Sequence, residues 1–275
     1  MILLIDAGNT RAKFAWLDNG PNGHRTPSQP LDYSDPSGLI RSFAEPPQRI
    51  LGSNVAGADL TAPLEEACRE HWGLAIEWKD ARDGTGLLRN PYAQPARLGA
   101  DRWLALLGLL RRIARQSDWT ADTPYILASF GTATTVDTLR RATGQRPPAA
   151  FLGGLILPGV TLMAQSLADG TAQLPLGGGP CRDFPADTHS AIASGIAAAQ
   201  GGALLRQWQL ARHTSQRPAR VYVTGGGWPT VGDDVSRLLA EAQADAGLPR
   251  RPPEWLDAPV LDGLAWLHQR APRRG

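Results

Sequence analysis

A short motif occurs twice in this chain of 275 residues and restricts the architectures that it can adopt. Residues 3–10 read LLIDAGNT, and residues 126–135 read ILASFGTATT. Each copy is an apolar run typical of a buried strand, followed by a glycine and by side chains with hydroxyl or amide groups. Glycine lets the backbone turn sharply, and successive amide groups of such a turn form a concavity that binds anions. The repeat therefore favours two related half-molecules that grip one polyphosphate, as in a phosphotransferase.

Composition indicates a soluble globular protein. The length suits two modest domains better than one. Hydrophobic residues make up 42% and charged residues 20%, and the net charge of +2 is too small to indicate a nucleic-acid or anionic-membrane partner. Two cysteines, Cys68 and Cys181, cannot form a disulfide framework, which is consistent with a reducing compartment. Residues 1–5 are too short for a signal peptide or a membrane span. We therefore expect a cytoplasmic protein.

Hydrophobic periodicity predicts a duplicated α/β fold with mixed sheets flanked by helices. A strand hairpin is expected at residues 2–6 and 12–17, with a turn at 19–20 and a loop over the Pro/Gly/Ser-rich residues 21–38. The further expected strands are 49–55, the run that begins at Tyr125, 136–139 and 220–227, and the expected helices are 60–72, 101–115, 160–168, 188–212 and 260–268. Residues 118–124 form the expected seam between an N-terminal lobe, residues 1–118, and a C-terminal lobe, residues 119–275.

Asp6 precedes the first glycine turn and Lys13 follows it. A carboxylate at the end of an apolar strand, as at Asp6, is unfavourable unless it is paired or binds a metal, and in a nucleotide site the obvious metal is Mg²⁺. The alternative is a turn residue that accepts backbone amides. Lys13 can reach a phosphate as a point charge or can be an ordinary exposed strand lysine. No GxxxxGK[ST] sequence occurs, which excludes a P-loop, and neither GxSxG nor HExxH is present.

A third group of residues opens the predicted helix at 101–115. Gly99, Ala100, Asp101 and Arg102 follow an Asn-Pro-Tyr sequence at residues 90–92. At a helix N-terminus the dipole stabilises an anionic side chain, and free amides can hold a bound carboxylate. Helix capping by Asp101 is the simpler interpretation. It leaves the glycine turn, the arginine and the upstream loop unexplained.

Together these segments resemble the type III pantothenate kinases, also called the Bvg accessory factor family, within the acetate-and-sugar-kinase/Hsp70/actin superfamily. Residues 6–13 resemble the first phosphate motif of that family, residues 99–102 its Gly-x-Asp-Arg substrate motif, and residues 130–137 its second phosphate loop. Three further segments fall in the family's order, namely 153–159, 188–195 and 224–226. The resemblance covers the whole chain and implies two ribonuclease-H-like domains.

The resemblance implies transfer of the γ-phosphoryl group of ATP to the primary hydroxyl of pantothenate, giving 4′-phosphopantothenate, the first step toward coenzyme A. By this analogy Asp101 is the general base, which only has to orient the hydroxyl and accept a proton that is lost late in a loose transition state. The expected ATP-binding residues are Asp6, Ala7, Gly8, Asn9, Thr10, Arg11, Ala12, Lys13 and Thr132, with Asp6 close to Mg²⁺. A glycine turn at 224–226 would bind adenosine in the C-terminal lobe.

The same resemblance implies a shared pocket for pantothenate. The expected pocket residues are Tyr92, Gly99, Ala100, Asp101, Arg102 and Thr188. In this family Thr188 would come from the neighbouring subunit, which makes a homodimer necessary for activity.

One position departs from the family's pattern. The second phosphate motif usually begins with an aspartate that helps to bind a monovalent cation, K⁺ or NH₄⁺, and here that position is Ser129. A neutral hydroxyl is a weaker ligand for a hard ion than a carboxylate. We expect the potassium dependence to be weakened or lost, or another group such as Asp137 to substitute.

Three classes of function stay open on the sequence alone. The first is the pantothenate kinase. The second is a kinase of the same superfamily that acts on another small metabolite. The third is a catalytically weak or non-catalytic regulatory protein that keeps the fold, which the neutral residue at 129 leaves open.

Overall fold

The computed structural model describes residues 1–18, 20, 23–41, 45–116, 123–141 and 149–270. The chain divides into two compact units. The first comprises Met1–Trp119, Gly144–Ala150 and Asp257–Gly275, and the second comprises Thr120–Thr143 and Phe151–Leu256. The last helix therefore belongs to the first unit, and the functional division at residues 118 and 119 stays a prediction. Within the described residues, no helix is long and apolar enough to cross a membrane.

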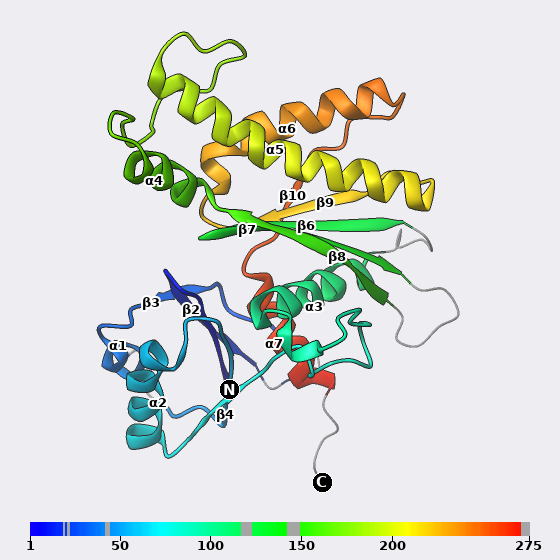
Figure 1. Cartoon of the computed structure of the whole chain (residues 1–275). Helices are drawn as coiled ribbons and strands as arrows, with labels where there is room; N and C mark the ends of the chain where they lie inside the picture. Colours follow the sequence, from blue (N-terminus) through cyan, green and yellow to red (C-terminus); the bar gives the residue numbers. More distant parts are fainter. Residues whose placement is uncertain (19, 21–22, 42–44, 117–122, 142–148, 271–275) are drawn as a thin grey trace. The chain divides into compact units, whose positions relative to one another are not determined.

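The first unit is built on a five-stranded mixed sheet (Figure 1). The central strand β1 pairs antiparallel with β2 and parallel with β4, and β4 pairs parallel with β5. In spatial order the strands are β3 (Gln29–Leu31), β2 (Ala12–Leu17), β1 (Ile2–Ala7), β4 (Arg49–Asn54) and β5 (Ile76–Trp78). β1 is buried on both faces, which explains its nearly continuous apolar sequence.

Side chains alternate along a strand, so the two faces of this sheet have different neighbours. Leu3 and Ile5 pack with Leu64 on the face covered by α1 (Pro36–Arg41) and α2 (Ala58–Trp72). The opposite face, which includes Asp6, is covered by α3 (Ala100–Ala114) and α7 (Pro259–Arg270) (Figure 1). Asp6 and its strand partner Lys13 therefore lie on the α3 side of the sheet.

α3 and α7 approach each other closely through glycines. A Cβ atom at Gly108 would lie 2.0 Å from the carbonyl oxygen of Pro259, and one at Gly263 would lie 2.1 Å from that of Leu104. Asp262 on α7 also forms an ion pair with Arg25, whose Nε lies 2.9 Å from its carboxylate oxygen. These contacts fix α3, and with it the residues at its N-terminus, within the first unit.

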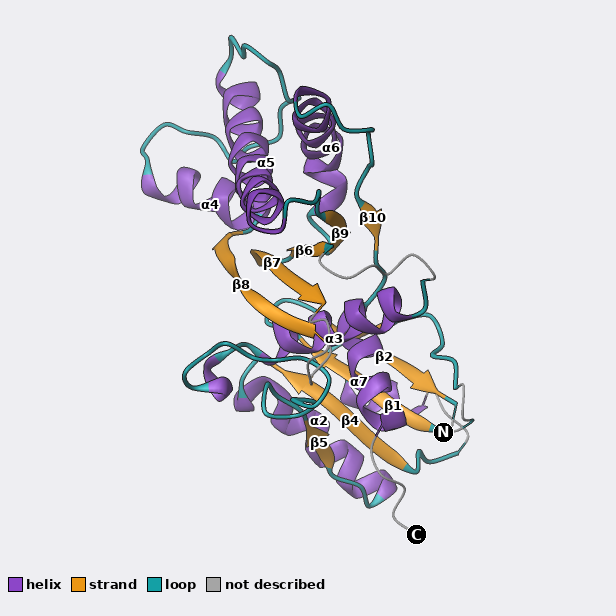
Figure 2. Cartoon of the chain, turned by 90° about the vertical axis from the view of Figure 1, so that its right-hand side faces the viewer, coloured by secondary structure: helices purple, strands orange, loops and turns teal. Residues whose placement is uncertain are grey.

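The second unit contains a second five-stranded sheet whose helices pack on one face (Figure 2). Ile126 and Phe130 of its central strand pack with Trp208 and Val235 in the core of this unit. The strands in spatial order are β8 (Ala149–Pro158), β7 (Ala133–Arg141), β6 (Pro124–Phe130), β9 (Arg220–Thr224) and β10 (Glu254–Trp255), and the helices are α4 (Val160–Gly170), α5 (Thr188–Ser215) and α6 (Trp228–Asp245). The first two residues of β8, 149 and 150, belong to the first compact unit, and the rest of the strand belongs to the second.

The two sheets have the same topology. In each, the first strand of the unit is central, the second strand pairs with it antiparallel, and the fourth pairs with it parallel. The order β3-β2-β1-β4-β5 thus corresponds to β8-β7-β6-β9-β10. This correspondence confirms the predicted duplicated α/β fold with mixed sheets flanked by helices.

The structure corrects the predicted loop at residues 21–38. β3 and the beginning of α1 lie within it, while residues 21 and 22 are outside the described residues. β3 is a three-residue edge strand that contains Pro30, and α1 has a single buried residue, Leu39, so neither has a strong periodic signal. α6 was also not expected, because Pro229 and Gly232 interrupt its pattern. The predicted turn at Asn19 and most of the predicted seam at 118–124 fall outside the described residues.

Candidate active site

Asp6 lies near the carboxyl end of β1, in the middle of a row of three polar side chains. The strand register places Lys13 of β2 opposite it on one side and Ser53 of β4 opposite it on the other. Paired residues on neighbouring strands point to the same face of a sheet. Lys13, Asp6 and Ser53 therefore share the face that α3 covers.

The electrostatic environment of Asp6 disfavours its negative charge. Its pKa is raised from 3.8 to about 7, first by burial and second by the negative charge of Asp101, whereas Lys13 acts to lower it. Asp6 and Asp101 are thus close enough to interact, although 95 residues separate them in the chain. Two neighbouring carboxylates in a poorly solvated site disfavour each other's negative charge, and a cation bound to one of them would relieve that repulsion.

The turn after β1 has the tight geometry that its glycine allows. A Cβ atom at Gly8 would lie 2.8 Å from the carbonyl oxygen of Arg11. The hydroxyl of Tyr33 donates a hydrogen bond of 2.9 Å to the carbonyl oxygen of Gly8. Burial, with the charge of Asp6, raises the pKa of Tyr33 to about 12, so this hydroxyl stays a donor. Tyr33 is a site residue that the sequence did not reveal, because it lies within the predicted loop at residues 21–38.

The N-terminus of α3 carries the predicted substrate motif. Gly99 is the N-cap residue, and its carbonyl oxygen accepts a hydrogen bond of 3.1 Å from the backbone N–H of Trp103. Asp101 lies in the first turn, where its carboxylate accepts a hydrogen bond of 2.8 Å from the backbone N–H of Arg102. The interpretation of Asp101 as the N-cap residue is therefore wrong. A Cβ atom at position 99 would lie 2.7 Å from the Asp101 carboxylate oxygen, so only glycine leaves that carboxylate in place.

Arg102 and Tyr92 come together beside this motif. Arg102 is 7% exposed, and its Nη1 donates a hydrogen bond of 3.3 Å to the hydroxyl of Tyr92. The backbone N–H of Tyr92 donates to the side-chain oxygen of Asn90 over 3.0 Å, which forms a turn of the Asx type. The Asn-Pro-Tyr segment and α3 thus form one cluster. The first unit brings together residues 6–13, Tyr92 and residues 99–102.

The second glycine turn, after β6, is held by backbone contacts within the second unit. The carbonyl oxygen of Thr132 accepts a hydrogen bond of 2.9 Å from the N–H of Gly159, and that of Phe130 accepts one of 2.9 Å from the N–H of Gly227. A Cβ atom at Gly159 would lie 2.1 Å from the carbonyl oxygen of Gly131. Gly225 has φ of +101°, and a Cβ atom there would lie 2.4 Å from the carbonyl oxygen of Phe130. The predicted glycine segments 153–159 and 224–226 therefore pack against the predicted phosphate loop.

Ser129 occupies in the second sheet the position that Asp6 occupies in the first. It pairs with Thr135 on one side and with Thr224 on the other. This row contains hydroxyl groups and no carboxylate. Asp137 lies two residues beyond Thr135, on the same face of the sheet, and is 2% exposed.

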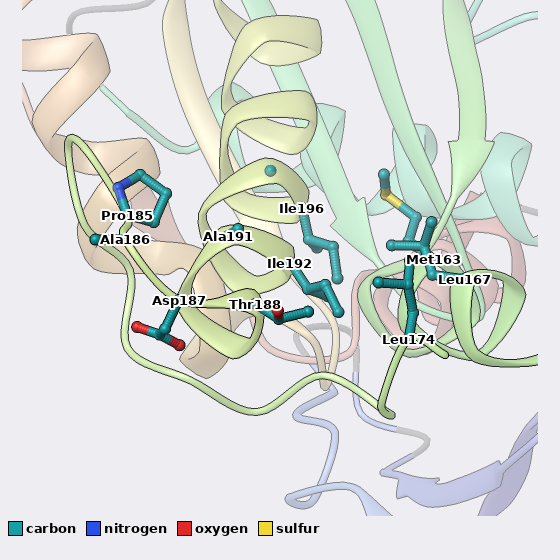
Figure 3. A pocket seen from close by; sticks show the side chains of 11 residues that line it. Met163, Leu167, Leu174, Pro185, Ala186, Asp187, Thr188, Ala191, Ile192 and Ile196 are labelled. Atoms are coloured by element: carbon teal, nitrogen blue, oxygen red, sulfur yellow. The ribbon is translucent and has the colours of Figure 1, made fainter. Parts of the chain in front are cut away.

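Thr188 lies in the second unit at the start of α5, on the rim of an apolar cavity (Figure 3). Asp187 caps this helix, since its carboxylate accepts a hydrogen bond of 2.9 Å from the N–H of Ser190. The cavity has a volume of about 670 Å³. Its apolar lining comes mainly from α4, α5 and the segment between them, with Met163, Leu167, Leu174, Ile192 and Ile196.

The described residues offer few groups for a metal ion. No cluster of three or more His, Cys, Asp or Glu side chains that could hold one occurs among them. Magnesium is commonly held by one or two carboxylates, with phosphate oxygens and water as the other ligands. Asp6 fits this arrangement as a single protein ligand.

Comparisons with known proteins agree with the motifs. A family model described as type III pantothenate kinase matches residues 2–210. Among relatives named type III pantothenate kinase, that of Bordetella petrii is 51% identical over 271 residues and that of Bordetella pertussis is 45% identical over 272 residues, with 97% of each chain covered in both comparisons. A solved structure from Sinorhizobium meliloti, provisionally named 2-dehydro-3-deoxygalactonokinase, has a TM-score of 0.50, is 13% identical and covers 98% of both chains. That likeness supports the fold alone.

Proposed function

This chain belongs to the type III pantothenate kinase family, and on that premise we propose that it transfers the γ-phosphoryl group of ATP to the primary hydroxyl of pantothenate. The product is 4′-phosphopantothenate, and the reaction is the first step of coenzyme A biosynthesis. The observation that carries the proposal is the 51% identity to a named pantothenate kinase over 97% of both chains. The neighbouring carboxylates Asp6 and Asp101, beside a glycine turn, supply chemistry that suits it.

Asp101 is the general base in this proposal. Phosphoryl transfer has a loose transition state in which the attacking hydroxyl loses its proton late, so the base only has to orient that hydroxyl and accept the proton. The hydrogen bond from the N–H of Arg102 holds one carboxylate oxygen of Asp101 and leaves the other oxygen for the substrate. Most of the rate enhancement then comes from in-line positioning and from neutralisation of phosphate charge.

Residues 6–13 and Thr132 are the proposed ATP-binding residues, from one glycine turn in each unit. Asp6 would hold the Mg²⁺ that accompanies ATP, and the bound ion supplies positive charge to the phosphate oxygens. Its raised pKa is consistent with a carboxylate placed for a cation, since a neighbouring positive charge favours the ionised form. Lys13 provides a further positive charge on the same face. The glycine turn at 224–226 is proposed to bind adenosine.

The proposed pantothenate pocket consists of Tyr92, Gly99, Ala100, Asp101 and Arg102, completed by Thr188 of a second subunit. Exposed apolar side chains near Thr188 in the sequence support a homodimer, since such side chains are costly in water. Phe184 is 95% exposed and Leu176 is 61% exposed. A monomer at assay concentration, seen by sedimentation velocity, would contradict this part of the proposal.

A monovalent cation is expected to have a smaller role here than in relatives with an aspartate at position 129. The row Thr135, Ser129 and Thr224 offers only neutral oxygen atoms. Asp137 lies two residues beyond Thr135 on the same face of the strand. It is the proposed substitute ligand if potassium binds. K⁺ or NH₄⁺ therefore stays a proposed cofactor.

The proposed function is tested with a panel of small alcohols and carboxylates incubated with ATP and Mg²⁺. Release of ADP should be rapid with pantothenate and slow with the other compounds. Expression of the chain should also rescue a bacterial strain that lacks pantothenate kinase. Preferential phosphorylation of another metabolite, or no turnover with any of them, would overturn the proposal.

A further inference from the structure

Ser53 is a buried polar residue of the first unit that the proposed mechanism does not use. It lies on β4, is 0% exposed, and is paired with Asp6 in the parallel register of β1 and β4. Paired side chains on neighbouring strands point to the same face. Ser53 is therefore the direct neighbour of Asp6 on the side opposite to Lys13.

The hydroxyl of Ser53 has no hydrogen-bond partner among the residues that the structure describes. Buried hydroxyl groups are normally paired, because leaving one unpaired costs free energy that an alanine would avoid. Thr61, also 0% exposed, illustrates the normal case, since its hydroxyl lies 3.1 Å from the carbonyl oxygen of Gly57 and 3.0 Å from the amide nitrogen of Asn54. The hydroxyl of Ser53 is thus available for a hydrogen bond that forms only in another state of the protein.

We propose that Ser53 is a positioning residue for Asp6: its hydroxyl donates a hydrogen bond to the Asp6 carboxylate when that carboxylate holds the Mg²⁺ of bound ATP. The inference rests on the proposed function of Asp6. Neighbouring strands lie about 4.8 Å apart, so a change of the Ser53 rotamer brings its oxygen within reach of the Asp6 side chain. The bond would leave the second carboxylate oxygen of Asp6 for the ion.

Such a bond would matter because hydrogen bonds to metal-binding carboxylates orient them. Loss of an outer partner of this kind typically lowers metal affinity by about 10- to 100-fold. Lys13 is the neighbour of Asp6 on β2, so the two flanking groups act from opposite sides. Lys13 places a positive charge near the Asp6 carboxylate, whereas the Ser53 hydroxyl would orient that carboxylate.

The test uses the full chain and calorimetric binding of ADP with Mg²⁺ and, separately, with EDTA. Ser53→Ala should weaken ADP binding in Mg²⁺ by about tenfold and leave binding in EDTA unchanged. The KM for Mg²⁺ should rise while the KM for pantothenate does not. Asp6→Asn should remove the effect, so the double variant should bind Mg²⁺·ADP as Asp6→Asn alone does.

Thr138→Val is the matched control, because the Thr138 hydroxyl is also buried without a partner among the described residues but lies in the second unit. It should leave the Mg²⁺ dependence of ADP binding unchanged. Equal Mg²⁺ dependence in Ser53→Ala and the unmodified chain, or an additive effect in the double variant, would overturn the inference. If the unmodified chain binds Mg²⁺·ADP but does not phosphorylate pantothenate, the proposed function fails while the role of Ser53 stands.

Discussion

At the scale of single residues, the central feature is Asp6, whose surroundings disfavour the ionised form of its carboxylate. Asp6 is partly exposed, yet its pKa is raised to about 7 by burial and by Asp101. The unfolded chain has an ordinary Asp pKa of 3.8 at this position. The folded protein therefore binds the Asp6 proton more tightly than the unfolded chain, and stability is lost as the pH rises from about 4 to about 7. Below pH 4 Asp6 contributes no pH dependence.

We therefore predict that Asp6→Asn stabilises the metal-free protein at high pH. At pH 8 in EDTA, the free energy of unfolding should increase by about 2–3 kcal/mol, which is below the ~4 kcal/mol of three pKa units because Asp6 keeps some contact with water. At pH 5 the gain should fall to about 1 kcal/mol, because Asp6 is then ionised in the unfolded chain but still mostly protonated in the folded protein, and only the first third of the loss has occurred. Urea denaturation at the two pH values measures this. An equal gain at both values would show that the effect does not come from ionisation of Asp6.

At the scale of secondary-structure elements, the sequence predicts well those with a periodic core face. β1, β2 and α3 were expected within one residue of their observed bounds, because apolar periodicity and glycine turns mark them. β3, α1 and α6 were missed, since edge position, few buried residues or an internal Pro and Gly weaken that signal. The pairing of Asp6 with Ser53 could not be predicted, because register depends on contacts between strands far apart in the sequence.

The start of α3 yields a prediction about Gly99. Gly99→Ala is compatible with the backbone, whose φ is −51°, but its Cβ would lie 2.7 Å from the Asp101 carboxylate oxygen. The carboxylate is the mobile partner and must move, and a displacement of about 1 Å at a reacting group can cost about 100-fold in rate. We expect kcat to fall by that order with little change in melting temperature. Gly86→Ala is the matched control, because a Cβ there meets nothing within 4 Å. Equal kcat in both variants would contradict the role of Gly99.

At the scale of the whole molecule, two units of identical sheet topology carry different residues at equivalent positions. Asp6 in the first sheet corresponds to Ser129 in the second. The motif repeat predicted this duplication, and the strand orders confirm it. The return of α7 to the first unit could not be inferred from the sequence, because an amphipathic helix does not indicate which sheet it covers.

The neutral residue at position 129 predicts a weak dependence on potassium. The unmodified chain should be about as active in the chloride of a large inert cation as in KCl, because hydroxyl groups bind hard ions less tightly than carboxylates. Ser129→Asp should introduce activation by K⁺. Initial rates in the two salts at equal ionic strength measure both effects. Strong potassium activation of the unmodified chain that Asp137→Asn abolishes would instead assign the cation to Asp137.

Pantothenate-dependent ADP release by Asp101→Asn, compared with Asp59→Asn, tests the proposed catalytic base most directly. Asp59 lies in the first turn of α2, so the control makes the same chemical change at an equivalent helix position outside the proposed site. We predict that Asp101→Asn lowers kcat by about 10²- to 10⁴-fold while Mg²⁺·ATP binding and the melting temperature are retained, and that Asp59→Asn keeps full activity. An Asp101→Asn variant that phosphorylates pantothenate at the unmodified rate would contradict the account.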